Sequence, residues 1–172
     1  YSSLKADSIA EDQEQILSKH YKLAIYQFPS PNDVQQLVLN GQKNQFEYGN
    51  FCIAPDSTFA LCSECERTPS QFRCHIARVL PQNGRWHLDT VFRFNDLQDS
   101  YNSMPHLFEL NAQLRLVYSA QQANGLGGTD IWLATVNKEG QIIENNNLGV
   151  LNSIENEVSP WYDPLFKRLY FS

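Results

Sequence analysis

The chain repeats one hairpin pattern three times, and this repetition limits its possible folds more than any other feature. Each copy joins two short apolar runs through a turn that carries a proline or polar residues, and each copy ends in a serine. The closing serines are Ser63, Ser119 and Ser172, so successive copies lie 56 (119−63) and 53 (172−119) residues apart. Recurrence at this spacing is typical of repeat proteins, in which each unit buries its apolar face against its neighbours. Function is therefore expected from an assembly of units rather than from one catalytic triad.

Each full unit has the pattern of four antiparallel strands. The first hairpin turns at Pro55, where proline presets one dihedral angle and the following Asp and Ser bond to local backbone. Two further runs follow each hairpin, and the third is rich in β-branched and aromatic residues. The strands expected in the two full units are 52–54, 59–63, 71–79 and 86–92, then 105–108, 114–119, 129–136 and a run from Gln141. Units of this kind predict an all-β fold, a β-propeller with four-stranded antiparallel blades.

The whole chain is expected to be part of one propeller domain with about three visible blades, a partial ring. The blades are 1–43, 44–99, 100–152 and the first hairpin of a further blade, 153–172. In the first blade, 1–4, 21–28 and 33–40 are expected strands, and 5–19 is an acidic insertion that forms a short helix or a loop. A rival register places strands at 8–12 and 15–18. Because the pattern opens and stops inside a blade, we expect further chain on both sides, without which residues 1–172 are not self-sufficient.

Charge and motifs exclude several classes of function. The net charge is −6, with 13 basic and 19 acidic residues, which disfavours a nucleic acid partner. No apolar run of about 18 residues is present, so we expect no membrane insertion by this segment. The glycines of 125–128 precede a strand, whereas a phosphate loop precedes a helix, and we therefore expect no cofactor there. Asp130 is expected to make a structural hydrogen bond. No hydrolase motif occurs, and we predict a non-catalytic chain without a metal site.

Four cysteines, Cys52, Cys62, Cys65 and Cys74, lie within the first full unit. An even, clustered set favours two disulfides in an oxidising compartment, and free structural thiols remain an alternative. The Cys-x-x-Cys spacing of Cys62 and Cys65 also permits a zinc or redox site, although no second such pair is present. Because Cys65 and Cys74 flank one loop and the other two lie on the paired strands before it, we expect the bonds Cys65–Cys74 and Cys52–Cys62.

The later part of the chain resembles the TolB-like, WD-repeat-like propeller repeat of OmpA-family cell-envelope proteins. The resemblance rests on Gly-Gly-Thr-Asp-Ile-Trp at 127–132, Asn-Leu-Gly at 147–149, Glu-Val-Ser-Pro at 157–160 and Leu-Tyr-Phe-Ser at 169–172. It is strong over 102–172, moderate over 51–95 and weak before that. The cysteines are not part of the family pattern, and residues 71–75 depart from it. The resemblance implies a periplasmic or outer-membrane-associated protein of a Gram-negative bacterium, of a kind that in some cases serves type IX secretion or gliding.

The expected function is that of a non-catalytic propeller that docks other cell-envelope proteins as a subunit of a larger complex, in secretion or peptidoglycan-anchoring machinery. Aromatic side chains are the usual anchors of such contacts. The candidate partner-binding residues are Trp161, Tyr162, Tyr101 and Phe108. The alternative is the propeller of a glycosidase, or of a peptidase whose catalytic domain is absent from this sequence.

Overall fold

The structure is a computed structural model that describes residues 24–26, 34–36, 39–40, 46–67, 72–92, 94 and 101–172. Every regular element in these residues is a β-strand, which confirms the all-β prediction. The strands are β1 (Ala24–Tyr26), β2 (Val34–Gln36), β3 (Leu39–Asn40), β4 (Phe46–Ile53), β5 (Ala60–Arg67), β6 (Phe72–Gln82), β7 (Arg85–Leu88), β8 (Tyr101–Leu110), β9 (Gln113–Gln121), β10 (Asp130–Val136), β11 (Ile142–Asn147), β12 (Trp161–Asp163) and β13 (Arg168–Tyr170).

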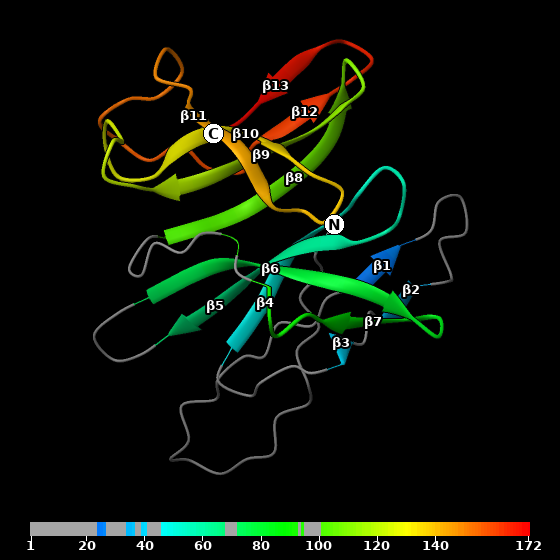
Figure 1. Cartoon of the computed structure of the whole chain (residues 1–172). Helices are drawn as coiled ribbons and strands as arrows, with labels where there is room; N and C mark the ends of the chain where they lie inside the picture. The colour runs from blue at the N-terminus through cyan, green and yellow to red at the C-terminus, as the bar shows by residue number, and fades with distance from the viewer. Residues whose placement is uncertain are drawn as a thin grey trace, which may run out of the picture.

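Two four-stranded antiparallel meanders form the body of the described structure. We name β4 to β7, together with the added strand β3, sheet I, and β8 to β11 sheet II. The pair β12 and β13 is hairpin III, and β1 pairs separately with β2. In both sheets the strands lie side by side in chain order, which confirms the four-stranded units read from the sequence. Figure 1 shows sheet I in cyan and green below sheet II in yellow-green, with hairpin III in orange and red beyond it.

Apolar side chains from facing sheets fill the space between them. Strands β4, β5 and β6 contact β8, and Leu61 of sheet I packs in one buried cluster with Leu116 and Tyr118 of sheet II. The opposite face of sheet II packs on hairpin III, where Val117 lies with Leu169. Sheet II thus directs alternate residues of β9 toward sheet I and toward hairpin III. The described sheets form an open stack in which sheet II is covered on both faces.

The first strand of each meander, β4 or β8, carries a bulge where the sequence prediction placed the beginning of the strand. β4 begins at Phe46 and β8 at Tyr101, upstream of the predicted starts at 52 and 105. The pairing register shifts between Gly49 and Cys52, and again between Ser103 and His106. A bulge interrupts the ladder without ending the strand, and it accommodates Pro105, which has no N–H to donate. The two predicted starts were therefore wrong.

The outer edge of sheet I also differs from the prediction. The fourth strand was expected to reach residue 92 but ends at Leu88, because the Asp89 carboxylate accepts hydrogen bonds from the backbone of Val91 and Phe92 and turns the chain. The expected strand 33–40 is divided: β2 pairs with β1, and β3 joins β7 in parallel. Both the acidic insertion 5–19 and the rival strands 8–12 and 15–18 lie outside the described residues.

Candidate functional site at hairpin III

Hairpin III has one face packed on sheet II and one open aromatic face. Tyr162 and Leu169 form a cross-strand pair and pack on sheet II. The neighbouring pair is Trp161 and Tyr170, whose exposed fractions are 48% and 45% and whose ring centroids lie 5.6 Å apart. Because side chains alternate along a strand, burying one pair turns the next pair away from the core. The result is a tryptophan and a tyrosine held side by side at the surface.

Further exposed apolar side chains lie at the hairpin's turn and after its second strand. Leu165 and Phe166 in the turn and Phe171 after β13 are all exposed. Arg168 lies over the Phe166 ring, with its guanidinium carbon 5.9 Å from the ring centroid. Large exposed aromatic side chains beside a cation are characteristic of protein interfaces. We call the set Trp161, Leu165, Phe166, Tyr170 and Phe171 the hairpin III face.

The structure separates the four aromatic residues predicted from the sequence. Trp161 is the one that lies clearly at the surface. Phe108 is only 7% exposed, and Tyr162 stacks on it with ring centroids 4.3 Å apart, so this pair forms part of the core. Tyr101 is half-buried and lies beside Phe72, far along the chain from hairpin III. Phe108 is therefore corrected from a candidate anchor to a core residue. Tyr170 was missed, although its place opposite Trp161 in a short hairpin would have indicated it.

His106 of β8 contacts hairpin III beside Trp161. Its Nε2 lies 3.1 Å from the Tyr162 carbonyl oxygen, and its ring lies 5.9 Å from the Trp161 ring, measured between centroids. Burial lowers the pKa of His106 below its ordinary value of 6.5, and the hydrogen bond to Tyr162 opposes this in part. The neutral imidazole is therefore the form that joins β8 to β12.

The backbone adopts the left-handed region at the same place in all three repeats. Asn50, Met104 and Ser159 have φ values of 49°, 56° and 57°. Each lies on or just before the innermost strand of its unit, and for Asn50 and Met104 the position coincides with the bulge. Such φ values are uncommon for residues other than glycine. This recurrence supports the repeat at the level of backbone conformation.

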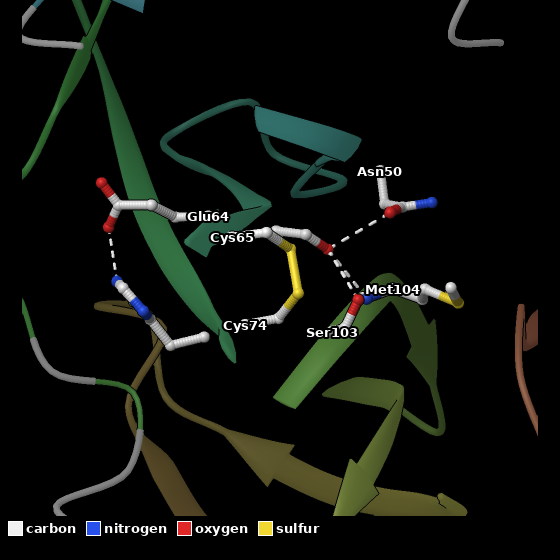
Figure 2. The surroundings of a disulfide bond; sticks show 8 residues. Asn50, Glu64, Cys65, Cys74, Ser103 and Met104 are labelled. Carbon is white, nitrogen blue, oxygen red and sulfur yellow. Dashed lines mark hydrogen bonds and ion pairs between the residues drawn. A yellow bond between two sulfur atoms is a disulfide. The ribbon is translucent and has the colours of Figure 1, made fainter. Parts of the chain in front are cut away.

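Two of these positions, Asn50 and Met104, are joined by polar contacts across the stack. Ser63 Oγ accepts a hydrogen bond from Met104 N at 2.9 Å and lies 3.2 Å from Ser103 Oγ. It also donates to Asn50 Oδ1 at 3.3 Å. Figure 2 shows this network on the same side of β5 as the disulfide. The closing serine of the first repeat therefore ties the bulge of its own unit to the bulge of the next.

One of the two expected disulfides is present. Cys65 and Cys74 are paired directly across β5 and β6 and are joined by a disulfide (Figure 2). Cys52 and Cys62 are free, so the expected Cys52–Cys62 bond was wrong. Cys52 lies opposite Leu61 and packs between sheets I and II, whereas Cys62 packs on the other face of sheet I. A shift of one residue in the pairing places the two sulfur atoms on opposite sides of the sheet.

On the face of sheet I that is directed away from sheet II, hydrogen bonds join a row of side chains from three strands. Glu64 is paired with His75, whose Nε2 contacts one carboxylate oxygen, and Tyr48 donates its hydroxyl proton to the other at 2.6 Å. The Glu64 side chain is largely buried and that of His75 is half-exposed. In Figure 2, Glu64 points away from Cys65, on the opposite side of β5. This geometry satisfies a buried carboxylate.

The glycine loop before β10 is built around Asp130. This buried carboxylate accepts hydrogen bonds from Leu126 N at 2.7 Å and Asn147 Nδ2 at 2.9 Å, as expected of a structural aspartate. A Cβ at Gly127 would lie 2.5 Å from the Ile154 carbonyl carbon, so glycine is required where the loop meets the segment before hairpin III. Within the described residues no group of three or more His, Cys, Asp or Glu side chains could hold a metal ion. Nor do those residues include a helix long and apolar enough to cross a membrane.

Comparison with known proteins gives no relative for this chain: no family model, no curated protein and no solved structure matches it.

Proposed function

We propose that this chain is a docking module of a cell-envelope complex, and that the hairpin III face binds an apolar surface of another envelope protein. The observation that carries the proposal is the exposed Trp161 and Tyr170 pair on a hairpin whose other face packs on sheet II. Aromatic side chains held in place by a packed scaffold lose little conformational entropy on binding, which is why they dominate interface energetics.

Equivalent positions in the other two copies of the repeat support this assignment, because a neighbouring sheet or hairpin covers them. Leu61, Val117 and Tyr170 each lie two residues before the closing serine of their copy. Leu61 is buried against sheet II and Val117 against hairpin III, whereas Tyr170 is exposed. The partner surface on Tyr170 therefore has the chemistry of a sheet face in this stack, flat and apolar.

The proposed architecture is a β-propeller of which sheets I and II are blades and hairpin III the inner half of another. Its support is the order of strands in each meander, the face-to-face packing and the repeated bulge. The Cys65–Cys74 disulfide supports an oxidising compartment, and we propose the periplasm or the periplasmic side of the outer membrane. Secretion or peptidoglycan-anchoring machinery is the proposed setting.

The experiment is to follow the size of the native complex in extracts of cells that express the chain. We expect Trp161→Ala combined with Tyr170→Ala to move the protein from a large species to a smaller one. Ile143→Ala, on the exposed face of β11, is the matched control and should leave the large species unchanged. Because all three side chains are exposed, unfolding midpoints should agree among the variants. If the double variant stays in the large species, the hairpin III face is not the docking surface.

A further inference from the structure

Met104 is the single methionine of the chain, and it occupies a conformation that such a side chain rarely adopts. Its φ is 56°, at the bulge of β8. A long side chain in the left-handed region is held there only when its surroundings fix it, and such positions are concentrated at functional sites. Several contacts hold Met104 in this conformation.

The Met104 side chain joins sheet II to the segment that leads into hairpin III. Its Sδ accepts a hydrogen bond from Ser159 N at 3.2 Å, and Ser159 Oγ lies 3.6 Å away. Its own backbone N–H is bonded to Ser63 of sheet I. Met104 is thus in contact with all three repeats, and its sulfur contact lies in an exposed part of the structure.

We infer that Met104 is a reversible oxidation site, at which a hydroperoxide converts the thioether to a sulfoxide. The thioether sulfur attacks the peroxide, one oxygen is transferred to Sδ, and the O–O bond breaks to release water or an alcohol. Sulfur is oxidised by two electrons and the peroxide is reduced by two. In the reverse step two thiols reduce the sulfoxide, which yields the thioether, a disulfide and water.

The other reduced sulfur atoms, those of Cys52 and Cys62, pack within apolar clusters. Cys62 is fully buried, and Cys52 packs in the core between sheets I and II. The thiolate is the form that reacts with peroxide, and burial raises the pKa of both thiols. Oxidation at low peroxide is therefore directed to Met104 instead of the cysteines, the reverse of the order expected for exposed side chains.

Sulfoxide formation changes the junction because there is no room for an added oxygen between the Met104 sulfur and Ser159 N. A hydrogen bond from Ser159 N to a sulfoxide oxygen requires about 2.9 Å by itself, whereas Ser159 N lies 3.2 Å from the sulfur. An oxygen added on this side of the sulfur either moves Ser159 away or deprives its N–H of the sulfur as acceptor. Since β12 begins shortly after Ser159, at Trp161, the start of hairpin III is loosened in both cases.

The test is to treat the native protein with a low dose of hydrogen peroxide, map the oxidised residue by peptide mass spectrometry, and measure backbone amide exchange. We expect one added oxygen at Met104, with both cysteines still titratable after unfolding. Exchange of the Ser159 amide should become about tenfold faster, since one hydrogen bond is lost. Methionine sulfoxide reductase with a dithiol should restore the original rate.

Met104→Leu is the matched control, because it keeps the side-chain volume but has no sulfur. In this variant peroxide should add no oxygen and should not change exchange at Ser159. The inference is overturned if native Met104 resists a dose that oxidises it in the unfolded chain, or if the sulfoxide forms without faster exchange at Ser159. Neither readout needs a partner protein, so the result is independent of the docking proposal.

Discussion

Cys52 and Cys62 lie on opposite faces of sheet I, although they belong to two strands joined by one tight turn. Cys52 is paired with Leu61 across β4 and β5 and packs toward sheet II. Cys62 is the next residue along β5 and packs with Tyr48 and Val79 on the other face. The two thiols cannot approach each other without a shift of the strand register.

We predict that both of these thiols are unreactive in the native protein. Desolvation raises the pKa of Cys52 to about 12, and it raises that of Cys62 as well. At pH 8 the reactive thiolate is therefore scarce in either residue. Thiol titration should detect no reactive cysteine in the folded chain and two in urea. Rapid reaction of either thiol before unfolding would show that sheet I is not packed as described.

The Cys65–Cys74 disulfide is expected to stabilise the fold. It closes a loop with a sequence separation of 9 residues, for which the chain-entropy model gives roughly 3 kcal/mol. Cys65→Ala combined with Cys74→Ala should reduce the free energy of unfolding by about this amount. A thiol reductant should lower the stability of the wild-type protein to the same level and leave the double variant unaffected. Equal sensitivity to reductant in both proteins would refute this assignment of the bond.

Stability should fall in mild acid through His106. Burial places the folded-state pKa of His106 below its ordinary value of 6.5. In this pH range the unfolded chain then binds more protons than the folded chain, so the free energy of unfolding decreases as the pH drops below 6.5. Urea denaturation between pH 7.5 and pH 5 should show the decrease. His106→Gln should show a smaller decrease over the same range, and identical pH profiles would contradict the role of His106.

The packing of the glycine loop, residues 125–128, can be tested by adding one methyl group at Gly127. In Gly127→Ala the new Cβ meets backbone atoms of Ser153 and Ile154 at 2.5–2.6 Å, which cannot move without shifting the chain. We expect a loss of about 2 kcal/mol, typical of overpacking. Gly49→Ala is the control, because a Cβ there has no neighbour within 4 Å. If the two variants are equally stable, the loop does not pack against the segment before hairpin III.

The strands and their order were predictable because each run has local signals. Asn83 and Gly84 connect β6 to β7 with positive φ, as expected of a two-residue hairpin turn. The third strand of sheet II, β10, matches the prediction within one residue, since Ile131 and Trp132 lie in a β-branched and aromatic run that ends in the Asn137 turn.

The bulges and the orientation of side chains were not predictable in the same way. Hydrogen bonding between distant residues decides where a register shifts, and a shift of one residue exchanges the two faces. This explains why a bond between Cys52 and Cys62 was wrongly expected. Phe108 lies in sheet II, which is covered on both faces, so Tyr162 covers its ring and it does not reach the surface.

The measurement that tests the docking account most directly is site-specific photo-crosslinking from alternate positions of hairpin III. A photoreactive phenylalanine analogue is placed singly at 161, 162, 169 and 170 in cells that express the chain. The account predicts crosslinks to one other envelope protein from positions 161 and 170, which face outward. It predicts none from 162 and 169, which pack on sheet II. Crosslinks within the chain alone from 161 and 170, or the same partner captured from all four positions, would contradict it.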